Sequence, residues 1–282
     1  MPQEAPKKTA LVLGSGGARG WAHVGVVKAL AELSIVPDIV VGSSIGSVVG
    51  AMYAAGQIAK AEELAPNLDW TRIAKLFLEF GISRSGLFEG KRIMKFFGEF
   101  IPVKHIQDLP VAYAAVATDL YTQEEVVMKE GGLLEAIRAS IAIPGLFTPA
   151  RHGRKWLVDG GLVNPLPVSV ARTMGAGRVI GVDVNLREGK APTPAKEDGK
   201  EKKEDKAPFL PDVITRSFRV AENSITRERL LRQPPDILIQ PEVGHIATLE
   251  FQRGEEAMAA GYRAAMEKHE ELCSYQLFPT KG

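Results

Sequence analysis

Three short, glycine-rich segments of this 282-residue chain combine groups that could carry out acyl transfer. One of them, GSSIG at Gly42 to Gly46, has a serine in a G-x-S-x-G pattern. A serine hydroxyl becomes a nucleophile when a base takes its proton, and this pattern places such a serine at the tip of a sharp turn. The sequence therefore predicts Ser44 as a nucleophile, with the two glycines letting the backbone double back without a Cβ clash.

The residues around GSSIG predict the strand and the helix that a nucleophile elbow needs. Ile39 to Val41 is a short, β-branched apolar run that is typical of a buried strand. The small, uncharged residues after the turn predict a helix that ends near Gly56. An ordinary strand-to-helix turn is one alternative. A membrane span is another, because residues 39–59 carry no charge and include a GxxxG spacing. We prefer a helix buried in the core.

A second segment, GSGGARG at Gly14 to Gly20, follows an expected strand at Thr9 to Leu13 and precedes an amphipathic helix. The backbone N–H groups of such a loop converge on an anion. They could form an oxyanion hole, which binds the negative oxygen of a tetrahedral intermediate. They could instead bind a dinucleotide, which normally needs G-x-G-x-x-G and an acidic residue about 20 residues later. The glycine spacing differs from that pattern and Asp38 precedes GSSIG, so we rank the nucleotide site lower.

The third segment, DGG at Asp159 to Gly161, follows a predicted strand at Trp156 to Val158. A carboxylate at this position would be presented to a cleft by a flexible turn, although Asp-Gly turns are also common without any function. Another hydrolase arrangement is a triad in the order serine, acid and histidine, which Ser44, Asp159 and His245 satisfy.

The composition narrows the class of protein. A net charge of +1 and the lack of an arginine-rich helix argue against a nucleic-acid partner. The single cysteine, Cys273, excludes an internal disulfide. Acids and histidines do not gather at metal-ligand spacing, so we expect neither a metal nor a cofactor. The N-terminal segment lacks the features of a signal peptide, and we expect a cytoplasmic protein.

Alternating strand and helix patterns predict an α/β fold with a mostly parallel sheet, which we expect to be one domain over residues 1–282. The loop after an expected helix at 132–140 contains Ile143, Leu146 and Phe147, which either border the mouth of the site or pack in the core. Further strands are expected at 111–118, 124–128, 178–184 and 235–241, and further helices at 59–80, 91–100, 165–174 and 250–272.

The segment 189–208 differs from the rest because it is dense in Lys, Glu, Asp and Pro, and it predicts a mobile insertion. A helix expected at 209–233 follows it and carries Phe218, Val220, Ile225 and Leu230 among its apolar positions. We interpret this helix as packed on the core, with a lid or a membrane-facing helix as the alternative.

GSGGARG, GSSIG and DGG in this order resemble the patatin-like phospholipase family, in particular its compact bacterial members related to the catalytic domain of neuropathy target esterase. The similarity continues through HVGVVKAL, VATDL, ASIAIPGLF and LVDGGLVNPLPV and is weakest at 189–208. It implies a patatin-like three-layer α/β/α sandwich and a serine hydrolase of lipid acyl esters that uses a Ser–Asp dyad without histidine. A non-catalytic nucleotide-binding module or membrane-associated scaffold remains the alternative from another class.

The resemblance also implies roles for individual residues. Ser44 would be the nucleophile, Asp159 its partner, and the backbone of Gly16, Gly17 and Ala18 the oxyanion hole. The family loop usually has one more glycine where this chain has Ser15. We expect a lipid or acyl-ester substrate and peripheral contact with the inner membrane surface, while the sequence does not identify the ester. Residues expected to support the loops are Gly14, Arg19, Gly20, Gly42, Gly46, Gly160 and Gly161.

Overall fold

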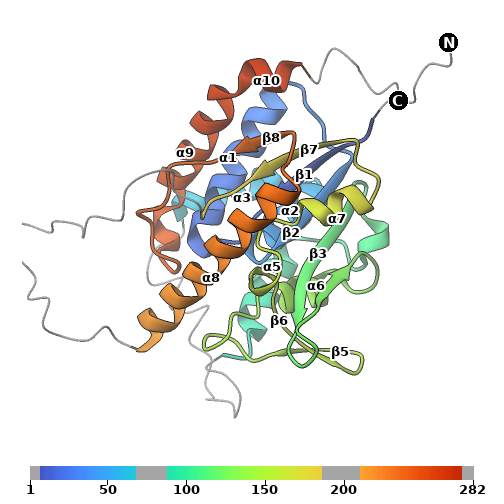
Figure 1. The fold of residues 1–282 in the computed structure, drawn as a ribbon, viewed down its shortest axis with the longest axis vertical. Coiled ribbons are helices and arrows are strands. Elements are labelled where there is room, and N and C mark those ends of the chain that lie inside the picture. Colours follow the sequence, from blue (N-terminus) through green and yellow to red (C-terminus); the bar gives the residue numbers. More distant parts are fainter. Residues whose placement is uncertain (1–6, 68–87, 186–209, 275–282) are drawn as a thin grey trace, which may run out of the picture.

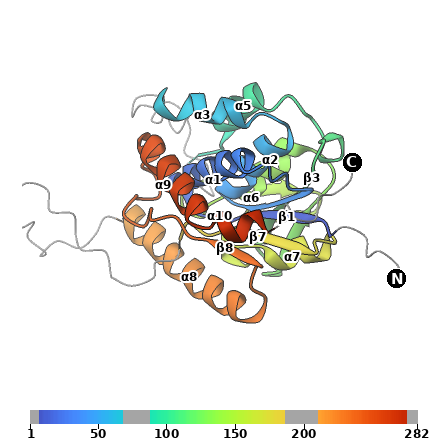
Figure 2. The same ribbon diagram turned by 90° about the horizontal axis from the view of Figure 1, so that it is seen from above.

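A computed structural model describes residues 7–67, 88–185 and 210–274, and its centre is a sheet of eight strands with helices on both faces (Figures 1 and 2). The strands follow the hydrogen-bonded path β5-β6-β3-β2-β1-β7-β8, with β4 paired to β3. The strands are β1 (Thr9–Leu13), β2 (Ile39–Ser43), β3 (Ala112–Asp119), β4 (Glu125–Met128), β5 (Ala150–His152), β6 (Lys155–Asp159), β7 (Arg178–Val182) and β8 (Ile237–Ile239).

Strands β3, β2, β1, β7 and β8 are mutually parallel, whereas β4, β5 and β6 pair antiparallel to their neighbours. The helices are α1 (Trp21–Glu32), α2 (Ile45–Ala54), α3 (Ile58–Leu64), α5 (Lys91–Phe100), α6 (Leu133–Ser140), α7 (Val168–Thr173), α8 (Leu210–Arg232), α9 (Gly254–Glu267) and α10 (His269–Cys273). Short 3₁₀ turns include η1 (Gly17–Gly20), η4 (Gly160–Leu162) and η5 (Phe251–Arg253).

Alternating side chains along the central strands divide the core into two parts, one on each face of the sheet. Leu11 and Leu13 of β1 pack with helices α1, α2, α6 and α9 on one face. Ala10 and Val12 of the same strand pack with α7 on the other. Figure 2 shows these layers, with α7 and α8 on the side opposite α1 and α2. The predicted three-layer α/β/α sandwich with a mostly parallel centre is therefore confirmed.

The loops that follow β1, β2 and β7 meet at one edge of the sheet because these strands are parallel and adjacent. Leu13 lies opposite both Gly42 of β2 and Val182 of β7, so all three strands end at the same level. In open α/β sheets, ligands bind at the carboxyl ends of the strands where the strand order reverses. Here the order reverses at β1, and the two predicted loops GSGGARG and GSSIG lie together at that edge.

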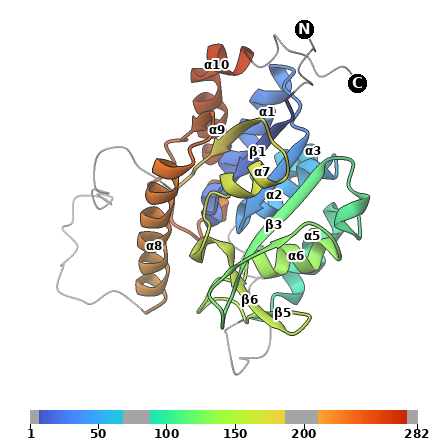
Figure 3. The ribbon, with the colours of Figure 1, turned by 45° about the vertical axis from the view of Figure 1, so that its right-hand side comes forward.

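An antiparallel strand reaches the same edge because β3 is longer than its neighbour β2. Residues 115–118 of β3 pair with β4 on one side. On the other side, β2 pairs with β3 up to Val116 and β6 pairs with it from Ala117 onward. Strands β2 and β6 therefore approach end to end, with Ser43 opposite Val116 and Asp159 opposite Ala117. This arrangement places the predicted acid beside the predicted nucleophile. Figure 3 shows β3 running toward β6 and β5.

Several predicted elements have different limits in the structure. The basic segment RHGRK forms the hairpin between β5 and β6, and the helix expected at 250–272 is divided into η5, α9 and α10. The helix expected from Pro165 begins only at Val168, since Pro165 and Pro167 lack the N–H groups that a helix interior needs. Of the helix expected at 59–80, α3 and a short 3₁₀ turn cover 58–67, and the rest lies outside the described residues. The insertion 189–208 also lies outside them.

The uncharged run 39–59 is not a membrane span, because it forms β2, a sharp turn and the ten-residue helix α2 inside the core. Within the part of the chain that the structure describes, no helix combines the length and apolar character needed to cross a bilayer.

Candidate active site

Ser44 occupies the sharp turn between β2 and α2, as the sequence predicts. Its backbone has φ 54° and ψ −126°, a conformation that residues other than glycine rarely adopt. Gly42 lies so close to the Gly46 carbonyl that a Cβ on Gly42 would overlap it, so only glycine fits at this position of the turn. The Ser44 N–H donates to Ser140 Oγ at 2.9 Å, and Ser140 Oγ in turn donates to Val116 O at 2.6 Å. The strained elbow is thus fixed to β3 through α6.

Asp159 ends β6 directly beside this turn. The Ser44 hydroxyl donates to Asp159 Oδ2 at 2.6 Å, and the Gly161 N–H donates to Oδ1 at 2.8 Å. Thr118 Oγ1 donates to the Asp159 carbonyl at 2.8 Å and holds the strand end against β3. The carboxyl group is fully buried. The two predicted residues are therefore in direct contact, with no third side chain between them.

The environment of Asp159 favours the protonated form of its carboxyl group more than exposure to water would. Burial is the main cause, and the nearby Glu222 carboxyl adds to it, so that the pKa of Asp159 is raised to about 8. The hydrogen bonds from Ser44 and Gly161 act in the opposite direction. A carboxylate with a raised pKa is a stronger base, and a pKa close to the operating pH is what general-base catalysis requires.

The glycine loop after β1 lies on the other side of Ser44, where Gly17 and Ser44 line the same cavity. Gly17 has φ 57° and a Cβ there would overlap the Thr248 carbonyl, so the position requires glycine. The Ala18 N–H donates to Thr248 O at 2.8 Å. Among the described residues, no acceptor is hydrogen-bonded to the N–H groups of Gly16 and Gly17. Of the three predicted donors, Ala18 therefore already has an acceptor, and Gly17 is the one that lines the cavity.

Buried polar side chains hold the glycine loop in place. His23 Nε2 donates to the Gly14 carbonyl at 2.8 Å, and burial lowers the pKa of His23 to about 4, so the ring is neutral at physiological pH. Arg19 is almost completely buried and donates to Ile246 O at 3.0 Å and to Asn185 Oδ1 at 2.7 Å. Arg19 thus connects the glycine loop to the segment around Ile246 and to Asn185 after β7. Burial, followed by the charge of Arg219, lowers the pKa of Arg19 to about 10.

The remaining predicted loop residues are glycines that allow close approach of other groups. A Cβ on any of them would lie within 3.0 Å of an atom of a neighbouring segment, and for most that atom belongs to the backbone. These glycines are Gly14, Gly20, Gly42, Gly46, Gly160 and Gly161.

Helix α8 contacts the site through polar residues that the sequence pattern did not indicate. Of its predicted apolar positions, Phe218, Ile225 and Leu230 are half-buried, whereas Val220 is 66% exposed. Among the positions of α8 whose burial is described, the buried ones are Glu222 and Thr226. Apolar periodicity cannot find such residues, because glutamate on a helix is usually exposed.

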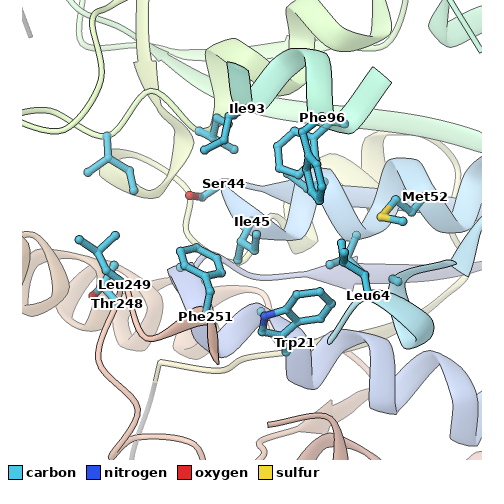
Figure 4. A pocket seen from close by; sticks show the side chains of 18 of the residues that line it. Trp21, Ser44, Ile45, Met52, Leu64, Ile93, Phe96, Thr248, Leu249 and Phe251 are labelled. Carbon is cyan, nitrogen blue, oxygen red and sulfur yellow. The ribbon is translucent and has the colours of Figure 1, made fainter. Parts of the chain in front are cut away.

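An apolar pocket extends from Ser44 between helices α1, α2, α3 and α5 (Figure 4). Its empty volume is about 1030 Å³, with the open mouth included. Figure 4 shows Ser44 near the middle and Met52 and Leu64 at one end. The walls also include Ile143, Leu146 and Phe147. These residues therefore border the cavity, which is the first of the two positions expected for them.

Two alternatives from the sequence do not fit this geometry. A triad requires an imidazole between the serine and the acid, but Ser44 bonds directly to Asp159, and His245 Nε2 pairs with Glu256 Oε1 at 2.6 Å. A dinucleotide site needs an acid at the ribose, but Asp38 accepts a hydrogen bond from Thr9 N at 2.8 Å at the opposite edge of the sheet.

A patatin-like phospholipase family model matches residues 11–172, which include all three glycine-rich segments. The chain belongs to the patatin-like phospholipase family. An uncharacterised NTE family protein of Mycobacterium tuberculosis is 40% identical over 178 residues, which are 63% of this chain and 49% of that protein. Patatin-like phospholipase domain-containing protein 6 of Mus musculus is 37% identical over 186 residues, which are 64% of this chain and 14% of that protein.

Another uncharacterised NTE family protein of M. tuberculosis is 31% identical over 274 residues, 93% of this chain and 46% of its own length. The chain thus spans about half the length of the mycobacterial relatives it matches. The crystal structure of VipD from Legionella pneumophila has a TM-score of 0.59 at 14% identity, covering 94% of this chain and 67% of that chain. The patatin-like fold is therefore shared by a protein of very different sequence.

The strained backbone of Ser44 predicts a difference between two variants that both remove the hydroxyl. Glycine accepts φ 54° without strain and alanine does not, so Ser44→Gly should be more stable than Ser44→Ala by about 1 kcal/mol, after the entropic cost of glycine. Urea unfolding of the two variants measures this difference. Equal stabilities, or a more stable alanine variant, would show that the elbow is not strained.

Proposed function

We propose that the protein is a serine hydrolase of lipid acyl esters in which Ser44 and Asp159 form a catalytic dyad. The observation that carries this proposal is the 2.6 Å hydrogen bond from the Ser44 hydroxyl to a fully buried carboxyl group of raised pKa. Membership of the patatin-like phospholipase family supports the same chemistry. The described residues offer no imidazole in contact with either group, so the acid itself would be the base.

In the proposed first half-reaction, Ser44 Oγ attacks the carbonyl carbon of the ester while its proton moves to Asp159. The N–H groups of Gly16 and Gly17 stabilise the negative oxygen that forms, an effect that is typically worth 10²–10³-fold in rate for each donor. The protonated Asp159 then gives the proton to the leaving alcohol, whose bond to carbon breaks. In the second half, Asp159 takes a proton from water, which attacks the acyl-enzyme and releases the carboxylic acid and Ser44.

The apolar pocket next to Ser44 supports an acyl chain as the bound group. Met52 lies eight residues beyond Ser44 along α2, which corresponds to about 12 Å of helix. The side chains along this path are almost entirely apolar. A nucleotide or phosphate would find few polar partners there, whereas an acyl chain would be removed from water along its length.

We also propose that the protein takes its substrate from a lipid surface. The turn after β3 and the β5–β6 hairpin extend past the edge that carries Ser44, because β3 continues beyond β2. Tyr121 on this turn is 75% exposed, and Trp156 on the hairpin lies under Arg151, with 5.2 Å from the guanidinium carbon to the ring centroid. Aromatic rings flanked by basic side chains are typical of the water–bilayer interface. The single-domain organisation and a cytoplasmic location remain predictions.

The dyad is tested by labelling with a fluorophosphonate, which reacts only with an activated serine. Wild type should form one adduct, located on Ser44, and Ser44→Ala should form none. Asp159→Asn should react about 10²–10⁴-fold more slowly, because the base is lost. Intact mass and peptide mapping measure both outcomes. A folded wild-type protein that forms no adduct would contradict the hydrolase proposal.

The pocket predicts a dependence on acyl chain length. The ratio kcat/KM should rise about fourfold for each added CH₂, equivalent to about 0.8 kcal/mol, and level off when the pocket is full. Hydrolysis of p-nitrophenyl esters of increasing length measures the rise. Met52→Trp should end the rise at shorter chains and leave the labelling of Ser44 by a small fluorophosphonate unchanged. A flat dependence in wild type would show that the chain does not bind in this pocket.

Contact with a lipid surface is tested by co-sedimentation with vesicles that contain anionic phospholipid. The double variant Tyr121→Ser/Trp156→Ser should bind the vesicles roughly tenfold more weakly, since two aromatic side chains no longer enter the interface. Val36→Ser is a matched control, because Val36 is also exposed but lies before β2, at the opposite edge of the sheet. An equal loss of vesicle binding in the double variant and in Val36→Ser would contradict the proposal that the edge of the sheet carrying Ser44 faces the lipid.

A further inference from the structure

Glu222 is a buried acid whose position is not explained by packing alone. It belongs to α8, and only 4% of it is exposed to solvent. A Cβ placed on Gly161 would overlap Glu222 Oε1 and would lie 3.1 Å from Asp159 Oδ1. The carboxyl groups of Glu222 and Asp159 therefore flank the space that Gly161 leaves empty. Burying a second acid this close to the first is costly, which points to a role.

Groups from four segments face the Glu222 carboxyl. Ser15 from the glycine loop makes a hydrogen bond to it, and Asn185 Nδ2 lies 3.5 Å from Oε2. The charges that act on it are those of Arg19 in η1, Asp183 after β7, and Arg219 one turn earlier on α8. Asp159 faces it across Gly161. The two arginines favour the ionised form of Glu222, while burial and Asp183 disfavour it.

We propose that Glu222 is a positioning residue that holds a negative charge behind Asp159 and so makes that aspartate a stronger base toward Ser44. This inference rests on the proposed dyad function, because it concerns the base of that dyad. Glu222 does not contact the reacting atoms. It acts through Asp159, and it also makes a hydrogen bond with the side chain of Ser15. One carboxyl group therefore connects the DGG segment at Asp159 to the glycine loop.

The order in which the two acids ionise supports this role. The pKa of Glu222 is raised to about 7, mainly by burial, and the pKa of Asp159 is raised to about 8, by burial and then by Glu222. Arg19, Arg219 and the hydrogen bond from Ser15 favour the ionised form of Glu222, whereas among the described residues no arginine is one of the groups that act on Asp159, so Glu222 is the acid that carries the charge first. A like charge nearby opposes the loss of the proton from Asp159, which raises the basicity of Asp159 and moves its ionisation to higher pH. Ser15, which stands where the family loop usually has glycine, supplies a hydrogen bond that stabilises the ionised Glu222.

The test is the pH dependence of Ser44 labelling by a fluorophosphonate in wild type and in Glu222→Gln. The glutamine keeps the shape of the side chain and removes its charge. Labelling of wild type should rise with pH as Asp159 ionises. In Glu222→Gln this rise should occur at lower pH by about one unit, and the limiting rate at high pH should fall roughly threefold, because the base is weaker. Thermal unfolding of each protein checks that the fold is intact.

Two further variants separate an electrostatic role from a structural one. Glu228→Gln is the matched control on the same helix, since Glu228 is exposed and pairs with Arg232 at 2.6 Å, and its pH profile should equal that of wild type. Glu222→Asp keeps the charge but moves it back by the length of one methylene group. The pH at which its labelling rises should therefore lie between the values for wild type and Glu222→Gln. This variant also provides the comparison if the glutamine variant does not fold.

The outcomes distinguish this inference from the function on which it rests. A rise at lower pH in Glu222→Gln, with an unchanged Glu228→Gln, would support the inference. A rate that falls equally at every pH, or a profile that does not move, would overturn it while leaving the dyad proposal in place. If wild type were not labelled at any pH, the proposed function itself would fail.

Discussion

The hydrogen bond between Ser44 and Asp159 is the interaction on which the rest of the site depends, and it requires a carboxyl group to be buried without a cationic partner in contact. Two hydrogen bonds, from Ser44 and Gly161, replace the water that the carboxyl group loses. Because the pKa of Asp159 is raised on folding, ionising it costs stability. This cost is absent below its ordinary pKa of 3.8 and grows as the pH rises toward about 8. The fold thus keeps a buried acid of raised pKa at the expense of its own stability.

The geometry of the sheet makes this contact precise enough for chemistry. Ser44 and Asp159 are 115 positions apart in the chain, yet both leave strands that end against the same edge of β3. Neighbouring strand ends are fixed by backbone hydrogen bonds, so the two side chains are held by rigid elements instead of by flexible loops. The glycine loop follows β1, the next strand in the sheet, and Gly17 of this loop lines the same pocket as Ser44.

The two sides of the site differ in chemical character, and each fits a different task. Toward α2, α3 and α5 the walls are apolar and can enclose an acyl chain. Toward α8 the contacts are polar and buried, with Arg19, Asn185 and Glu222 forming one connected group behind the loops. A buried polar network is stable only when its members satisfy one another, so a change at one of them affects the others. This explains why a helix with few buried apolar side chains still has a defined place against the site.

The α/β class, most of the strand and helix positions, and the three loops could be predicted from the amino-acid sequence, because glycine spacing and apolar periodicity are local signals. GSSIG, for example, predicts a sharp turn because its two glycines let the backbone double back, and in the structure a Cβ at Gly42 would overlap the Gly46 carbonyl. These local signals could not show that Asp159 meets Ser44 directly, that Ala18 donates to Thr248, or that Glu222 lies buried behind the acid. Each of these depends on contacts between residues far apart in the chain. Burial, which shifts the pKa of an acid, is a property of the assembled fold. It cannot be predicted from the residues that neighbour the acid in the sequence.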